Sequence, residues 1–567
     1  MTSRESASAY FDRAPRADVA RSRLPLAKVT VPEKFRRDWL IAALVFGLSA
    51  LHFSFFYNYT LVNGDEGIIL QGAQRILQGQ VLYRDFFSLL TPGSYYWMAF
   101  FFKIFGSSIL VGRAVLLVEG ALLSVLTYLI ARRVCSRWSA FLASVLVTLL
   151  GLPNRFLVLH NWDSTFWACL TLYSAVLFLQ FPGRQWLFVT GFFGALTCLF
   201  DQSKGAGIVF GLALGFAILV ISDRERLNNW KPGFFAAWAF GFALPFLVTF
   251  AYFGIEQGLS SMLADWFWPL RNYSAVNKTS YGFVLLSPAD RAEMSGDPWP
   301  LRMFMMVVTA PWFFVPALPF VAAASLIYWA PRKSAVNSGE NRRAYYVLIS
   351  AAIVGLFLAI VATGRPDFTH FVYVVPMLFV LLAWIIDGQM LPSAIRRALP
   401  VLIFGLLLSS VCFGLSILTQ PLNARYTLQT RRGTLKASHP DEILEYVQRH
   451  VPAGETLLVY PYLPLYYYLT DTHNPTRYEY LMPAFHTPDQ YQQVVRELKT
   501  DQTRIIVFEP SIREKLPVGF PGASPEMLSA PDPVADYINS HYRKCSDLTS
   551  QDFWRFAAMV RKDLQCP

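Results

Sequence analysis

The sequence of 567 residues is poor in charge, because only 15% of its residues are Asp, Glu, Lys or Arg. Soluble domains average about 25% charged residues, so a soluble protein of this length would lack the polar surface that its domains need. The 54% share of hydrophobic residues excludes intrinsic disorder, and 6 cysteines are too few for a small disulfide-rich scaffold. The scarcity of charge favours a protein that crosses a membrane several times.

Basic residues exceed acidic ones by 49 to 38, a net charge of +11. They occur in short clusters between apolar runs and not along one stripe, which argues against nucleic acid as a partner. A membrane helix needs about 20 mostly apolar residues. About eleven runs meet this need: 39–57, 109–131, 138–152, 164–181, 186–200, 205–221, 232–254, 301–329, 344–362, 371–386 and 398–418.

The basic clusters predict an orientation. Residues 1–38 form a long basic leader, so the first run is interpreted as an uncleaved anchor with its N-terminus in the cytoplasm. Alternating the runs then places every basic loop on the inner side, as the positive-inside rule requires. The transmembrane domain is thus 39–419, and its outer loops are 58–108, 153–163, 201–204, 255–300 and 363–370.

Residues 420–567 have the composition of a soluble domain on the outer side. The pattern predicts a helix at 441–449, a strand at 456–460, a helix at 489–498 and a strand at 504–508. Strands that alternate with helices are typical of a small α/β domain. Its two cysteines, Cys545 and Cys566, would form a disulfide in an oxidising compartment, but two separate thiols fit the spacing equally well.

The first outer loop holds two adjacent acids, Asp65 and Glu66, between Gly64 and Gly67. Residues 66–77 are expected to form a short amphipathic helix. Adjacent carboxylates at a membrane surface are costly to desolvate, which favours a functional role. The alternative for Asp65 is that it caps this helix, where Asp is a favoured residue.

The loop also carries a longer pattern that resembles the first loop of GT-C superfamily glycosyltransferases. The most similar groups are the dolichyl-phosphate-mannose protein mannosyltransferases and the bacterial aminoarabinose lipid A transferases. The resemblance covers residues 40–220 well and the remaining helices loosely. It implies a GT-C fold, a polyprenyl-phosphate-linked sugar donor, and a glycan, lipid or protein acceptor at the outer face. The matching residues are Asp65, Glu66, Gly79, Leu82, Tyr83, Asp85, Pro92, Tyr95, Tyr96, Phe105, Gly106 and Arg113.

Sugar transfer of this kind needs a base for the acceptor hydroxyl and cations for the leaving phosphate. A single displacement places these groups on opposite faces of the sugar and inverts its anomeric carbon. Asp65 is the candidate base, with Glu66 as its orienting or substrate-binding partner. Asp163, where relatives commonly carry a second acid, is a third catalytic candidate, although it could simply cap the helix that follows.

Four residues are candidates for binding the donor phosphate: Arg84, Lys204, Arg365 and His370. Arg84 matches a basic position of some relatives, and Lys204 must reach water or an anion because it lies where two helices meet. Arg365 offers a planar fork for phosphate, whereas a His such as His370 near a helix start is more often structural. Tyr83, beside Arg84, is a candidate substrate-binding residue.

His160 is a second candidate for substrate binding, and it also suggests a metal. Asp65, Glu66, Asp163 and His160 could together hold Mg²⁺, Mn²⁺, Ca²⁺ or Zn²⁺, although no spacing among them is diagnostic. No other cofactor is indicated. Arg113, which lies within the second apolar run, either serves the family role or extends its charge to the interface.

Two other function classes fit a polytopic chain. A transporter or flippase would carry repeated halves and ionisable groups at the membrane midplane, whereas the acids here lie near the ends of runs. A non-catalytic assembly subunit would present 420–567 to a partner. We therefore expect a glycosyltransferase of the bacterial plasma (inner) membrane, with 420–567 in the periplasm or outside the cell.

Overall fold

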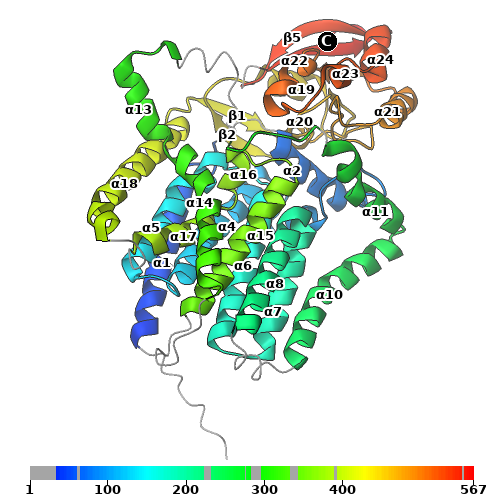
Figure 1. Cartoon of the computed structure of the whole chain (residues 1–567). Helices are drawn as coiled ribbons and strands as arrows, with labels where there is room; N and C mark the ends of the chain where they lie inside the picture. Colours follow the sequence, from blue (N-terminus) through cyan, green and yellow to red (C-terminus); the bar gives the residue numbers. More distant parts are fainter. Residues whose placement is uncertain are drawn as a thin grey trace, which may run out of the picture.

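In the computed structural model, a bundle of long helices forms the body of the chain, and a mixed α/β region covers one end of it (Figure 1). Part of the predicted basic tail and of the loop 255–300 lies outside the described residues. The structure describes residues 33–59, 64–222, 232–274, 276–282, 295–331, 342–387, 393–551 and 554–567.

Helices lie at all eleven predicted apolar runs, since such runs are stable in lipid only when their backbone groups bond internally. Two runs are each divided between two helices, at Ala310 and at 373–374. The helices are α1 (Glu33–Ser54), α4 (Ile109–Ala131), α5 (Arg137–Leu150), α6 (His160–Gln180), α7 (Arg184–Phe200), α8 (Gln202–Ser222), α10 (Pro232–Ile255), α13 (Trp299–Thr309), α14 (Pro311–Trp329), α15 (Arg342–Ala362), α16 (Phe368–Val372), α17 (Val375–Ile386) and α18 (Ser393–Leu422).

Six of the described helical stretches are long and apolar enough to cross a membrane. The others are shorter or more polar; α5, for example, has 14 residues, about 21 Å at 1.5 Å per residue. A count of eleven spans therefore stays a prediction. The six stretches are Ile109–Ala131, Gln202–Ser222, Gly233–Ile255, Trp299–Trp329, Arg342–Ala362 and Arg397–Leu422.

Glycines bring α8 and α15 together at backbone distance. A Cβ added to Gly211 would lie 2.5 Å from the carbonyl oxygen of Ala351, and one added to Gly355 would lie 2.2 Å from that of Gly207. Small residues at helix interfaces allow this approach, and in lipid such packing supplies much of the association energy. The two helices run side by side in the middle of the bundle (Figure 1).

Short helices of the predicted outer loops lie at the end of the bundle that faces the α/β region (Figure 1). The helix predicted at 66–77 is confirmed as α2 (Gly64–Leu77). The other elements of these loops are α3 (Gly93–Phe105), η1 (Leu152–Arg155), α11 (Leu259–Trp268) and η2 (Pro269–Tyr273).

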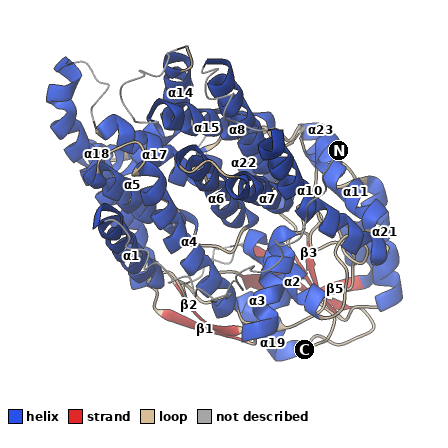
Figure 2. Cartoon of the chain, turned by 90° about the horizontal axis from the view of Figure 1, so that it is seen from below, coloured by secondary structure: helices blue, strands red, loops and turns tan. Residues whose placement is uncertain are grey.

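The strands of the α/β region form a hairpin and a mixed sheet of order β3-β4-β6-β5, in which only β3 and β4 are parallel. Figure 2 shows them beside α2, α3 and α19. Both predicted strands and both predicted helices are present. The elements are β1 (Tyr426–Thr430), β2 (Gly433–Ala437), α19 (Glu442–His450), β3 (Leu458–Tyr460), α20 (Leu465–Thr470), α21 (Pro488–Asp501), β4 (Ile505–Phe508), α22 (Ile512–Gly519), α23 (Pro525–Leu528), α24 (Pro533–His541), β5 (Tyr542–Thr549) and β6 (Arg555–Arg561).

The two cysteines of this region are paired. Cys545 on β5 and Cys566 beyond β6 form a disulfide with a Cα–Cα distance of 5.7 Å. Of the two alternatives that the spacing leaves open, the structure has the disulfide. It joins the antiparallel strands β5 and β6 at the end of the chain.

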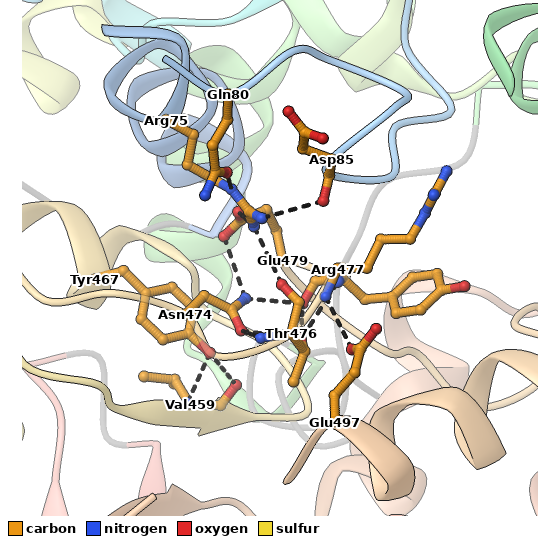
Figure 3. Close-up of polar contacts among 11 residues, drawn as sticks. Arg75, Gln80, Asp85, Val459, Tyr467, Asn474, Thr476, Arg477, Glu479 and Glu497 are labelled. Atoms are coloured by element: carbon orange, nitrogen blue, oxygen red, sulfur yellow. Dashed lines mark hydrogen bonds and ion pairs between the residues drawn. The ribbon is translucent and has the colours of Figure 1, made fainter. Parts of the chain in front are cut away.

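A buried ion pair attaches α2 to the α/β region (Figure 3). The Nη1 atom of Arg75 donates to Oε1 of Glu479 at 2.5 Å, and both side chains are less than 10% exposed. The same guanidinium donates to the carbonyl oxygen of Thr476 and to Gln80. Because a buried charge needs a partner, this pair fixes the α/β region against the first loop.

We predict that Arg75→Ala lowers the free energy of unfolding by about 3–5 kcal/mol, because it leaves the Glu479 charge buried without its partner. Arg504→Ala is the control. It removes an ion pair to Glu455 in which both side chains are exposed, so the loss should stay below about 1 kcal/mol. Equilibrium unfolding in detergent measures both variants, and equal losses would contradict the assignment.

Candidate functional site

Asp65 lies in the first turn of α2, where the helix dipole stabilises its negative charge. The helix begins at Gly64, so Asp65 is inside the helix and not its cap. Its side chain is 48% exposed. The hydroxyl of Tyr462 donates to its Oδ1 at 2.7 Å, and Nη2 of Arg155 lies 3.7 Å from its Oδ2. Asp65 is thus an accessible carboxylate between a phenol and a guanidinium.

Steric contacts explain why glycine stands on either side of the two acids. A Cβ on Gly64 would lie 2.3 Å from Cζ of Tyr462, and a Cβ on Gly67 would lie 2.1 Å from the backbone nitrogen of Leu465. Real side chains do not approach so closely. The segment between β3 and α20 therefore packs directly on the backbone of α2, and only glycine leaves room for it.

Glu66 is not brought to the accessible side of α2. It is fully buried and receives two hydrogen bonds from Arg113, Nε to Oε1 at 3.0 Å and Nη2 to Oε2 at 2.7 Å. The backbone N–H of Val158 also donates to Oε1. Arg113 is equally buried and donates to the carbonyl oxygen of Tyr59, so it does not extend toward the interface. This bidentate pair fastens α2 to α4.

The short segment around α16 brings a second group of charges near Asp65. Asp367, which caps α16, accepts from the Nδ1 of His370 at 2.7 Å and lies 3.0 Å from Nε of Arg365. Arg365 also donates to the carbonyl oxygen of Gly519 in the α/β region. Both Asp65 and Asp367 act electrostatically on Arg155, so the two carboxylates and their cations form one cluster.

His160 is the first residue of α6, and the charged groups that act on it are first Asp201 and Lys204, then Asp65 and His370. Burial lowers the pKa of His160 to about 4, so its imidazole is neutral at pH 7. A neutral imidazole can donate one hydrogen bond and accept another. The roles of His160 and His370 at the candidate site stay predictions.

Lys204 and Asp163 are turned toward other partners. The Nζ of Lys204 donates to the carbonyl oxygen of Asn161 at 2.6 Å and to the hydroxyl of Ser164 at 3.0 Å, which holds α8 against the start of α6. Asp163 is buried, and its ionisable neighbours are Glu119 and Lys204. Asp163 does not join the group around Asp65, whereas Lys204 lies at the edge of that group, with its Nζ 5.3 Å from the centroid of the Tyr373 ring.

Arg84 and Tyr83 are also engaged elsewhere. Arg84 donates to both oxygens of Asp85, at 3.0 and 2.9 Å, and lies 3.5 Å from Glu256. Tyr83 is fully buried, and its hydroxyl donates to the carbonyl oxygen of Leu90 and accepts from Nε1 of Trp266. Arg84 forms an ion pair with the adjacent Asp85. Tyr83 is buried and therefore not accessible to a substrate.

The structure does not assemble the metal site that the sequence suggests. Among the residues described, no group of three or more His, Cys, Asp or Glu side chains could hold a metal ion. Glu66 is bound to Arg113, and Asp163 lies against Glu119, so neither joins Asp65 and His160.

Three residues of the cluster are absent from the sequence prediction: Arg155, Asp367 and Tyr462. Arg155 and Asp367 lie in predicted outer loops near predicted acids, a signal that could have found them. Tyr462 has no local signal, because it contacts Asp65 across 397 residues of chain.

The comparison with protein-family models supports the resemblance seen in the sequence. The family model for dolichyl-phosphate-mannose-protein mannosyltransferases matches residues 90–252, which confirms the resemblance over that part. ArnT from Cupriavidus metallidurans, in a crystal structure with undecaprenyl phosphate, is 12% identical with a TM-score of 0.49, covering 94% of this chain and 99% of its own.

A second solved structure is the Archaeoglobus fulgidus oligosaccharyltransferase AglB, in complex with an inhibitory peptide and a dolichol-phosphate. It is also 12% identical with a TM-score of 0.49, and the match covers 94% of this chain and 75% of that one. No curated protein sequence matches the chain.

We predict that Gly67→Ala destabilises the protein by about 1–3 kcal/mol, because the new methyl group would press on the backbone of Leu465. Gly47→Ala on α1 is the matched control, since nothing lies within 4 Å of its added Cβ. That substitution should be neutral or slightly stabilising. Thermal unfolding in detergent and protease cleavage between β3 and α20 report the effect. A Gly67→Ala protein as stable as the control would disprove the close contact.

Proposed function

We propose that the chain is an integral membrane glycosyltransferase that moves a sugar from a polyprenyl-phosphate donor to an acceptor by inverting single displacement. The observation that carries the proposal is the half-exposed Asp65 carboxylate, set beside Arg155 and near the Arg365–Asp367–His370 group. The family match over 90–252 supports the same reaction class, because its name specifies a dolichyl-phosphate-linked mannose donor.

Asp65 is the base in this proposal. An acceptor hydroxyl transfers its proton to the carboxylate as its oxygen bonds to C1 of the sugar, and the bond from C1 to the phosphate oxygen breaks. The leaving phosphate gains negative charge in the transition state and needs cations close to it. Asp65 is suited to this role because it is accessible to solvent, whereas Glu66 is enclosed by Arg113.

Arg155 is the best candidate for the leaving phosphate. It borders Asp65, and the neighbouring Tyr373 and Asp65 raise its pKa further, so it stays charged. Its planar fork suits phosphate oxygens. Arg365 and His370 are secondary candidates from the sequence prediction that lie in the same group. Arg84 and Lys204 are reassigned to structural contacts, since each is bound to other parts of the chain.

Glu66 and Asp163 have supporting roles in this proposal. The pair between Glu66 and Arg113 holds the first turn of α2, and therefore Asp65, in place. Asp163 lies in the first turn of α6, buried beside Glu119. His160, neutral at the start of the same helix, is retained as a substrate-binding candidate.

The proposed location is the outer face of a bacterial plasma membrane, with 420–567 on the periplasmic or external side. The disulfide of Cys545 and Cys566 supports an oxidising compartment for this region. We further propose that this region contributes to acceptor choice, because its residues reach Asp65 and Arg365.

We predict that Asp65→Asn lowers transfer at least about 100-fold, because the amide cannot accept the proton of the acceptor hydroxyl. Asp547→Asn is the control, since Asp547 is an exposed acid paired with Lys544 on β5. Mass spectrometry of cell-envelope glycans from strains that carry each variant detects the missing sugar. Unchanged glycans with normal expression of Asp65→Asn would refute the proposed function and favour a transporter or an assembly subunit.

We predict that Arg155→Ala reduces the rate of sugar transfer about 100-fold through loss of a cation at the leaving phosphate. Arg84→Ala should leave the rate within about threefold of the wild type, because exposed ion pairs contribute little. The measurement is transfer from a radiolabelled polyprenyl-phosphate sugar in membranes. The reverse order of the two effects would restore Arg84 as the phosphate ligand.

A further inference from the structure

The carboxylate of Asp65 is contacted by a residue that no part of the predicted reaction has used. Tyr462 lies between β3 and α20, in the α/β region, and its hydroxyl donates to Oδ1 of Asp65 at 2.7 Å. Hydrogen bonds to a charged acceptor are short and roughly twice as strong as neutral ones. The contact therefore links a distant part of the chain directly to the accessible acid.

The position of the phenol is closely restricted. Its ring lies over Gly64, where an added Cβ would be 2.3 Å from Cζ, and the ring of Tyr480 lies edge to face with it at 6.0 Å. The backbone of the same segment presses on Gly67 at Leu465. The phenol cannot move far from Asp65 unless the whole segment leaves α2.

The hydroxyl of Tyr462 keeps its proton and can therefore donate a hydrogen bond. Burial and the adjacent Asp65 raise the pKa of the Tyr462 hydroxyl well above its usual value, so the hydroxyl keeps its proton throughout the range in which enzymes work. It can donate to Asp65 but does not serve as a base. Donation to the charged form of a carboxylate favours that form and also fixes its rotation.

We propose that Tyr462 is a positioning residue, which orients the Asp65 carboxylate, so that the α/β region completes the catalytic site. Tyr462 donates a hydrogen bond throughout and exchanges no proton with the acceptor. Its effect passes through Asp65 alone. This inference rests on the proposed function, since it assigns Tyr462 a task in the reaction of Asp65.

The first test measures the protonation of Asp65 and needs no substrate. In the full-length protein in detergent, infrared difference spectra recorded against pH follow the C=O band of the protonated carboxyl, which is assigned by its loss in Asp65→Asn. In Tyr462→Phe the midpoint should move to higher pH, because the carboxylate loses a donor. An unchanged midpoint would overturn the inference.

Tyr446→Phe is the matched control. Tyr446 lies on α19 in the same region, and its buried hydroxyl has no hydrogen-bond partner among the residues the structure describes. Removing that hydroxyl should leave the Asp65 midpoint where it is. An equal shift in both variants would mean that the effect is general to the region, and it would also overturn the inference.

The second test uses sugar transfer from a polyprenyl-phosphate sugar in membranes. Tyr462→Phe should lower kcat about tenfold, leave the donor KM unchanged, and shift the acidic limb of the pH profile upward. If Asp65→Asn has no effect, the proposed function fails. If Asp65→Asn abolishes transfer but Tyr462→Phe keeps the wild-type kcat and pH profile, only the inference about Tyr462 fails.

A third variant keeps the inference testable if Tyr462→Phe does not fold. Gly64→Ala retains the phenol but forces its ring away from the start of α2, because the added Cβ would meet Cζ at 2.3 Å. It should shift the Asp65 midpoint in the same direction as Tyr462→Phe. A wild-type midpoint in Gly64→Ala would overturn the inference.

Discussion

The contact between the backbone of α2 and the segment after β3 determines how the rest of the candidate site is built. Gly67 lies so close to Leu465 that no side chain fits between them, and Gly64 accommodates the ring of Tyr462 in the same way. Because glycine has no side chain, the two segments can approach this closely, and any larger residue at Gly64 or Gly67 would clash with the facing segment. The ion pair of Arg75 and Glu479 then fixes the opposite end of α2 to the same region.

The two adjacent acids owe their different environments to the geometry of α2. Successive side chains on a helix point about 100° apart, so Asp65 and Glu66 cannot face the same surroundings. Glu66 turns inward, where a bidentate bond to Arg113 compensates for the cost of burying its charge. Asp65 turns toward Arg155 and remains half-exposed. One acid can therefore hold the helix while the other stays available for chemistry.

Much of the fold could be predicted because its signals are local. The apolar runs predict where the helices lie, and the alternation of helix and strand around Leu458 and Ile505 predicts the α/β region. The site was harder, since its contacts join distant segments. Asp65, Arg365, His160 and His370 are proposed from their loops, and their roles stay predictions. Arg84 is reassigned in the proposed function because its guanidinium pairs with Asp85, the next residue, a contact that the sequence does not show.

The sequence predicts functional roles for Glu66 and Lys204, whereas the structure shows both bonded to other parts of the chain. Both differences have the same physical cause. Ionisable residues near membrane helices suggest function because burying them is costly. Partners within the chain can offset this desolvation cost. Arg113 does so for Glu66 through an ion pair, and Asn161 and Ser164 do so for Lys204 through hydrogen bonds. A charge is therefore a stronger candidate for chemistry when it stays accessible. By that criterion Asp65, and not its buried neighbour, is the residue on which the proposed reaction depends.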